Sequence, residues 1–259
     1  MNVALIGCDG FVGSAFARLF QRSSLQFTPV NRKSYNENRG KVWDIVIDAA
    51  SSSKKFIADE RPLIDMNASV GHSLNVLVDF PSQKHVLISS VDVYNKLDNP
   101  VATSEGTEIQ PQLLPNYGFH KYLSEMLVLR HAPNALIFRL AGMVGPRLKK
   151  NPVFDIINKL PLRIHPDSKY QFLHTDVIAD IVWELIPKLP AGEIVNVCGK
   201  GLISPYQIAE ITEADLDLSK VSGPPRIVDI SIEKLSRLIN IPCTFETILR
   251  FAGNNQLWS

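Results

Sequence analysis

The sequence predicts an α/β fold with a doubly wound parallel sheet and a small α/β lobe in its C-terminal half. Over the first half of the 259 residues, short apolar runs alternate with segments whose apolar residues recur at helical spacing. Strands that alternate with helices are joined by crossovers and therefore lie parallel. After Gly145 the alternation becomes irregular, and prolines such as Pro161, Pro166 and Pro187 interrupt it.

The regular half contains five expected strands and three expected helices. The strands are 3–6, 26–30, 43–48, 85–89 and 135–139, and the helices are 11–22, 61–80 and 115–131. Residues 31–42 leave little room for a crossover, so we expect any helix there to be short or missing.

The irregular half is expected to hold helices at 153–160, 175–185, 205–213, 231–238 and 244–251, and a strand at 194–197. We expect this part of the chain to return at least once to the main sheet. The predicted larger domain is 1–146 with a return segment at about 171–199, and the smaller lobe is 147–170 with 200–259. No clean linker separates the two parts, so we expect them to pack together.

Composition indicates a cytoplasmic globular protein. Lys and Arg number 27 against 26 Asp and Glu, which lacks the basic surplus of a nucleic-acid binder. The N-terminus has no signal-peptide pattern, and no apolar run is long enough to span a membrane. The cysteines Cys8, Cys198 and Cys243 have neither metal-ligand nor redox spacing, and the six histidines are scattered, so we expect no metal site.

A glycine-rich turn runs from Gly7 to Gly13, directly after the first expected strand. Gly7 can take a positive φ, Gly10 leaves room for a diphosphate, and Gly13 lets the helix pack closely on the strand. The backbone N–H groups at the helix start, around Phe11 and Val12, would face the phosphates. The turn predicts a dinucleotide-binding domain of the Rossmann type. The alternative is a glycine-rich turn that binds nothing.

The second expected strand is followed directly by Asn31, Arg32 and Lys33. NAD-binding domains usually place an acidic residue there, on the ribose 2′-hydroxyl. A guanidinium suits a 2′-phosphate by its charge and its paired donors. We therefore predict NADP as the cofactor, with NAD possible, unless Arg32 and Lys33 are only solvated loop charges.

Tyr117 and Lys121 are four residues apart on an expected helix and share one face. A free tyrosine has a pKa of about 10, and a nearby ammonium together with a cationic nicotinamide would favour its phenolate. Tyr117 would then exchange a proton with a substrate oxygen, and Lys121 would also hold the cofactor ribose. Ser90, at the end of a strand, would donate a hydrogen bond to the same oxygen. Alone, the Tyr-Lys spacing also fits an ordinary surface pair.

Together these features resemble the extended short-chain dehydrogenase/reductase superfamily, in its nucleotide-sugar epimerase/dehydratase branch. The resemblance covers nearly the whole chain. Besides the glycine triplet, Tyr117 and Lys121, it rests on residues 46–50 (VIDAA), 65–68 (DMNA), 89–94 (SSVDVY), 139–146 (RLAGMVGP), 172–177 (FLHTDV) and 196–199 (NVCG).

The resemblance implies that Ser90, Tyr117 and Lys121 are catalytic. It adds Ala49, Ala50 and Asn67 to the cofactor site and implies that the smaller lobe binds the nucleotide and diphosphate of a substrate. Many members have an Arg where this chain has Gln171. We therefore expect the basic run of Arg147, Lys149, Lys150 and Asn151 to supply diphosphate contacts, with Arg226 and Arg250 as weaker candidates. The alternative for this run is a solvated loop.

The resemblance also implies a homodimer through the other stripe of the catalytic helix. That stripe holds Phe119, Tyr122, Leu123, Met126 and Leu127. The alternative is that these side chains belong to the hydrophobic core of the protein.

The leading functional hypothesis is hydride transfer to or from a nucleotide-linked sugar, with a slight preference for a 4-keto-sugar reductase over an epimerase. Dehydration is less favoured, because Val91 and Asp92 after Ser90 lack the following Glu. Two alternatives remain: a reductase of a non-nucleotide ketone, and a catalytically inactive NADP-binding regulator or scaffold.

Overall fold

The computed structural model describes residues 1–253 as two compact units, each with its own hydrophobic core. Unit 1 comprises Met1–Asn95, Glu108–Leu140 and Ala179–Val195. Unit 2 comprises Lys96–Thr107, Ala141–Ile178 and the described residues from Asn196 onward. The chain therefore passes from one unit to the other more than once.

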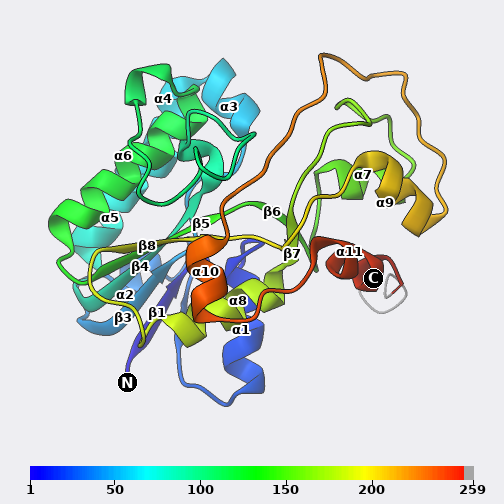
Figure 1. The fold of residues 1–259 in the computed structure, drawn as a ribbon. Coiled ribbons are helices and arrows are strands. Elements are labelled where there is room, and N and C mark those ends of the chain that lie inside the picture. The colour runs from blue at the N-terminus through cyan, green and yellow to red at the C-terminus, as the bar shows by residue number, and fades with distance from the viewer. Residues whose placement is uncertain (254–259) are drawn as a thin grey trace. The chain divides into compact units, whose positions relative to one another are not determined.

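A six-stranded sheet with the order β2-β1-β3-β4-β5-β8 forms the centre of unit 1 (Figure 1). Its strands are β1 (Val3–Ile6), β2 (Thr28–Val30), β3 (Trp43–Asp48), β4 (Ser82–Ser90), β5 (Ala135–Leu140) and β8 (Glu193–Val197). Neighbouring strands from β2 to β5 pair in parallel, and Ile6 lies opposite both Val30 and Asp48. The predicted parallel sheet, and the return of residues 194–197 to it, are confirmed.

Helices flank this sheet on both sides, which confirms the doubly wound arrangement. Figure 1 shows α5 (His72–Asp79) and α6 (Asn116–His131) on one side, with α1 (Gly13–Arg22) and α8 (Thr175–Leu185) on the other. Val76 of α5 packs in a cluster with Ala4 and Val46 of the sheet. Phe20 of α1 meets Trp183 of α8 edge to face, with ring centroids 4.8 Å apart.

Three local features of unit 1 refine the sequence prediction. The helix expected at 61–80 comprises α4 (Pro62–Met66), a π-helical turn (Asn67–Gly71) and α5. The crossover at 31–42 holds only the short α2 (Tyr35–Asn38), as expected. Helix α3 (Lys55–Glu60) was not expected, because the serines and lysines before it give no helical period.

Unit 2 combines a small sheet with four helices. Strands β6 (Gly142–Val144) and β7 (Phe172–His174) pair in parallel, and they escaped prediction because three residues show no periodicity. The helices are α7 (Pro152–Ile157), α9 (Pro205–Thr212), α10 (Glu233–Leu238) and α11 (Thr244–Gly253). Val153, Phe172, Ile208 and Ile248 lie in one buried cluster. Within residues 1–253, every helix is too short or too polar to span a bilayer.

Candidate active site

The run from Gly7 to Gly13 forms the tight turn between β1 and α1. Gly7 has a φ of 78°, as its predicted role requires. A Cβ on Gly13 would lie 2.0 Å from the Gly7 carbonyl oxygen, so any side chain there would push α1 away from the turn. Gly10 is exposed, and a Cβ on it would lie 3.1 Å from the same oxygen. Close packing therefore requires glycine at position 13 more strictly than at position 10. The absence of a side chain on Gly10 leaves space on the outside of the turn.

The start of α1 fits an anionic group. No side chain of the described chain caps this helix, and its first turn contains no acidic residue. The first N–H groups of a helix lack intrahelical acceptors and favour negative charge. Phe11 and Val12 are half-buried at this end, and Ala49 and Ala50 follow β3 beside the turn, with Ala50 only 2.8 Å from a Cβ built on Gly7. These residues fit the diphosphate of a dinucleotide.

Asn31 builds the turn after β2. Its Oδ1 accepts hydrogen bonds from the backbone N–H of Lys33, at 2.9 Å, and of Ser34, at 3.2 Å. Its Nδ2 donates to the carboxylate of Asp9 in the glycine-rich turn, at 2.9 Å. Arg32 and Lys33 are exposed on this turn. The two predicted parts of the cofactor site, the glycine-rich turn and the end of β2, are therefore in direct contact.

Ser90, Tyr117 and Lys121 come together in unit 1. Ser90 is the last residue of β4, while Tyr117 and Lys121 lie one turn apart on α6. The Lys121 Nζ atom is 5.5 Å from the centroid of the Tyr117 ring. Tyr117 and Lys121 are both buried, with exposed fractions of 8% and 5%. Asn67, the remaining predicted cofactor residue, is exposed at the start of the π-helical turn.

Burial raises the pKa of Tyr117, and the nearby carboxylate of Asp92 raises it further, whereas a hydrogen bond with Ser90 lowers it. The direction is opposite to the phenolate expected from the sequence. The reason is that desolvation of the buried phenol, together with the carboxylates of Asp92 and Asp65, outweighs the hydrogen bond with Ser90 in the protein alone. Tyr117 is therefore a phenol that keeps its proton at neutral pH.

Asp92 and Lys55 belong to the same cluster and were not predicted. The Ser90 hydroxyl donates to Asp92 Oδ2 at 2.9 Å, and Lys55 Nζ donates to Asp92 Oδ1 at 2.6 Å. Lys55 Nζ also lies 5.9 Å from the Tyr117 ring centroid. Lys55 sits on the unexpected helix α3. Asp92 could have been noticed from its position two residues after Ser90.

Lys121 is surrounded by acidic groups. Its ammonium donates a hydrogen bond to the Ser51 hydroxyl, in the loop after β3. Burial lowers the pKa of Lys121 to about 8, against the opposing influence of four carboxylates: Asp48, Asp65, Asp92 and Glu125. The residue predicted to hold the cofactor ribose is thus a buried cation with several counter-charges.

The residues expected to contact a substrate diphosphate lie in unit 2. Lys149, Lys150 and Arg226 are exposed, as is Arg250 on α11. Asn151 caps α7 through its Oδ1, which accepts from Phe154 N at 2.8 Å, and its Nδ2 donates to Met143 O at 2.8 Å. Its amide therefore shapes the loop that carries the lysines.

Gln171, which replaces the Arg found in many members of the resembled superfamily, is structural. Its Oε1 accepts from Ile230 N at 2.7 Å, and its Nε2 donates to Ile230 O at 3.2 Å. The buried side chain of Gln171 thus both accepts a hydrogen bond from and donates one to the backbone of Ile230.

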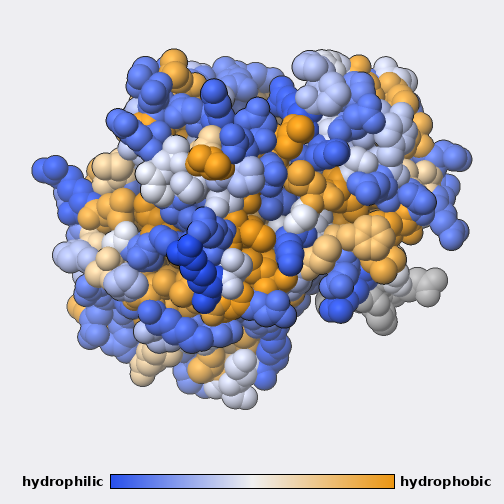
Figure 2. Space-filling view, in the orientation of Figure 1, coloured by the Kyte–Doolittle hydropathy of each residue, from blue (hydrophilic) through white to orange (hydrophobic). Residues whose placement is uncertain are grey.

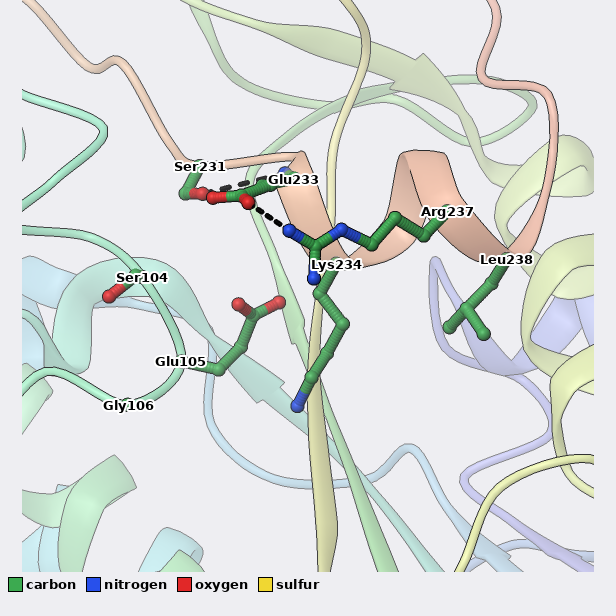
Figure 3. A pocket seen from close by; sticks show the side chains of 8 residues that line it. All are labelled: Ser104, Glu105, Gly106, Ser231, Glu233, Lys234, Arg237 and Leu238. Carbon is green, nitrogen blue, oxygen red and sulfur yellow. Dashed lines mark hydrogen bonds and ion pairs between the residues drawn. The ribbon is translucent and has the colours of Figure 1, made fainter.

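A separate cavity of about 300 Å³ lies within unit 2 (Figure 3). Figure 3 shows Arg237 directed toward Glu233, with which it forms an ion pair, and Lys234 extending toward Glu105. Glu105 Oε1 also accepts from Asn196 N at 2.9 Å. Acidic and basic side chains are balanced across this cavity, so its charge favours neither a cation nor an anion. The other lining residues are Ser104, Gly106, Ser231 and Leu238.

No family model matches the chain, and no curated protein matches it. Many solved structures share its fold. A UDP-galactose 4-epimerase is 20% identical with a TM-score of 0.79, covering 100% of both chains. A dTDP-4-dehydrorhamnose reductase from Bacillus anthracis in complex with NADP is 18% identical with a TM-score of 0.77, covering 96% of each. A dTDP-glucose 4,6-dehydratase from the same organism in complex with NAD is 18% identical with a TM-score of 0.76, covering 100% of this chain and 98% of the other.

Proposed function

We propose that this protein is an NAD(P)-dependent oxidoreductase or epimerase of the extended short-chain dehydrogenase/reductase superfamily, acting on a nucleotide-linked sugar. The observation that carries the proposal is the cluster of Ser90, Tyr117 and Lys121 in the same unit as the uncapped, glycine-rich start of α1. Solved structures that share the fold over nearly their whole length include an epimerase, a reductase and a dehydratase of nucleotide sugars, with NADP or NAD bound in two of them.

The cofactor, when bound, supplies or accepts the hydride. The chain's own residues handle the proton. Ser90 donates a hydrogen bond to the reacting oxygen, and Tyr117 gives that oxygen a proton as the alcohol forms. Lys121 binds the cofactor ribose and places a positive charge beside the phenol.

The slight preference for a 4-keto-sugar reductase over an epimerase rests on Arg32, which suits the 2′-phosphate of NADPH, and on the compact second lobe. In either reaction the reduction of a carbonyl needs an acid at this position, and burial together with Asp92 keeps the Tyr117 phenol protonated. We assign the diphosphate contacts of the substrate to Lys149, Lys150 and Arg226, which are exposed cations.

Titration of the purified protein with NADPH and NADH, followed by nucleotide fluorescence, tests the proposal. Binding of NADPH, and stereospecific transfer of its labelled hydride to a keto-sugar nucleotide, are expected. Binding without any transfer would favour the inactive regulator. Transfer to a simple ketone, with no competition by uridine or thymidine diphosphate, would favour the non-nucleotide reductase. Failure of both nucleotides to bind protein freed of carried-over cofactor would contradict the proposal.

Arg32→Ala is expected to reduce the preference for NADPH over NADH at least tenfold, since a hydrogen bond to a charged group contributes roughly 1.5–3 kcal/mol. Affinities for the two nucleotides, measured by fluorescence titration, check this. Arg39→Ala is the matched control, because Arg39 is an exposed cation of the same crossover that is already paired with Asp79 at 2.8 Å. An unchanged ratio in Arg32→Ala would show that Arg32 is a solvated loop charge.

We also propose that the protein is a homodimer through α5 and α6. An open apolar groove of about 560 Å³ runs along Val70, Leu123, Met126, Leu127, Leu129 and Arg130. Leu74 and Val78 on α5 and Met126 on α6 are exposed by 44%, 68% and 46%. Figure 2 shows hydrophobic side chains at the left of the view, where Figure 1 places these helices.

Met126→Lys is expected to convert the dimer into a monomer, because a cation in this apolar interface would be buried without a counter-charge and beside Arg130, which is also a cation. Sedimentation velocity at micromolar concentration measures this change. Val101→Lys, at an 81% exposed position in unit 2, is the control and should sediment as the wild type. A wild-type protein that sediments as a monomer would contradict the dimer.

A further inference from the structure

Asp9 is the acidic residue of the glycine-rich turn, and backbone hydrogen bonds fix its position. The N–H of Gly10 donates to the Gly7 carbonyl oxygen at 2.9 Å, which closes the turn around Asp9. The N–H of Gly7 donates at 2.8 Å to the carbonyl oxygen of Val30, the last residue of β2. Asp9 itself is exposed. The backbone therefore holds an exposed carboxylate beside the end of β2.

A side-chain hydrogen bond joins this carboxylate to Asn31, the first residue after β2. Dinucleotide-binding domains that use NAD usually have an acidic residue at this end of the strand, on the ribose 2′-hydroxyl. The backbone N–H groups of Lys33 and Ser34 both donate to Asn31 Oδ1, at 2.9 and 3.2 Å, which fixes the orientation of the amide. Its Nδ2 then donates to Asp9 Oδ2 at 2.9 Å. A carboxylate is thus held within hydrogen-bond distance of the residue that replaces the usual acid.

The end of β2 carries charges of both signs. Arg32 and Lys33 follow Asn31 directly, and both are exposed. A guanidinium suits the 2′-phosphate of NADPH, because it offers paired donors and a positive charge. A carboxylate accepts hydrogen bonds from the ribose hydroxyls of NADH and repels a 2′-phosphate. Asp9 and Arg32 therefore favour different nucleotides.

We propose that Asp9, positioned by Asn31, performs the role of the missing acid at the end of β2 and binds the adenosine ribose of NADH, so that the protein uses both NADH and NADPH. This proposal rests on the proposed function, because it concerns the nucleotide site. It adds the residue that limits the preference for NADPH that Arg32 creates.

Fluorescence titrations of Asp9→Asn with NADH and with NADPH test the role of Asp9. Asparagine keeps the size of the side chain and removes its charge. The affinity for NADH should fall about tenfold, the effect of losing a hydrogen bond to a charged group. The affinity for NADPH should rise, because the carboxylate no longer opposes the 2′-phosphate. An unchanged ratio of the two affinities would overturn the proposal.

Asp59→Asn is the matched control. Asp59 is an exposed aspartate on α3 in the same unit, so the substitution removes the same charge elsewhere on the surface. Both affinities should match those of the wild type. If Asp59→Asn shifted the ratio as much as Asp9→Asn does, the effect would belong to the net charge of the protein, and the proposal would be overturned.

The double variant Asp9→Asn with Asn31→Asp separates the carboxylate from the shape of the turn. It exchanges the two side chains, so an amide can still donate to a carboxylate across the turn, and a carboxylate oxygen can still accept from the N–H groups of Lys33 and Ser34. NADH affinity should return toward that of the wild type. If the double variant bound NADH as weakly as Asp9→Asn, loss of the carboxylate would not explain the weakening, and the proposal would be overturned.

The wild-type titrations distinguish a failure of this proposal from a failure of the proposed function. Tight binding of NADPH without binding of NADH would overturn the use of both nucleotides and leave the proposed function intact. Binding of both nucleotides in a ratio that Asp9→Asn does not move would do the same. Failure of both nucleotides to bind the wild type would contradict the proposed function itself.

Discussion

Tyr117→Phe should lower the rate of keto-sugar reduction by ~10²–10⁴-fold, the usual contribution of a positioned acid or base. Phenylalanine keeps the ring of this buried residue, which is only 8% exposed, and deletes only the hydroxyl. Nucleotide binding should therefore change little. Oxidation of NADPH followed by its absorbance, together with a fluorescence titration of nucleotide affinity, measures the two effects separately.

Tyr122→Phe is the control for this prediction. Tyr122 is a half-buried tyrosine on the same helix, one residue beyond Lys121. It should keep wild-type activity. If Tyr117→Phe retained more than a tenth of the wild-type rate, Tyr117 would not be the proton donor, and Asp92, which shares a hydrogen bond with Ser90, would become the candidate.

Glu125→Ala should destabilise the protein by about 3–5 kcal/mol, the range for breaking a buried ion pair from one side. Arg139 Nη2 donates to Glu125 Oε2 at 2.7 Å, Arg139 Nε donates to both carboxylate oxygens, and both side chains are almost fully buried. The Ser89 hydroxyl also donates to Glu125, at 2.5 Å. Truncation of Glu125 would leave a buried guanidinium without its counter-charge.

Thermal unfolding followed by circular dichroism measures this effect, and the midpoint should fall by on the order of 10 °C for a chain of this size. Glu184→Ala is the control, since Glu184 pairs with Lys188 at 2.6 Å on the surface of α8. An exposed pair of this kind contributes at most about 0.5 kcal/mol. Equal losses in the two variants would contradict the role of burial.

The parts of the site that depend on local sequence could be predicted. The turn from Gly7 to Gly13 requires glycine at fixed spacing, and Tyr117 and Lys121 share a helix face, so both signals lie within one short segment. Partners from distant segments could not be predicted. His72 reaches back 24 residues to Asp48, Lys55 reaches Asp92 across 37, and His120 reaches Asp65 across 55. Such pairs depend on how the strands and helices pack.

The secondary structure also has a part that could be predicted from local sequence and a part that could not. The sheet strands of unit 1 are buried apolar runs, and apolar runs are the strongest sequence signal for a parallel strand. Strands β6 and β7 carry no such run, because each has only three residues and some of these residues are half-buried. The role of Gln171 was equally hidden, since its partner is the backbone of Ile230, whose position no side-chain pattern reveals.

The interleaving of the two units along the chain constrains how the protein can be made. Unit 1 takes its last segment from Ala179–Val195, and unit 2 takes its first from Lys96–Thr107. A nascent chain that has emerged only as far as Leu140 lacks β8, which leaves the edge of β5 unpaired, and it holds only one strip of unit 2. Neither unit can close until these later segments have been made, so the emerging chain exposes the edge of β5 until β8 has been synthesised.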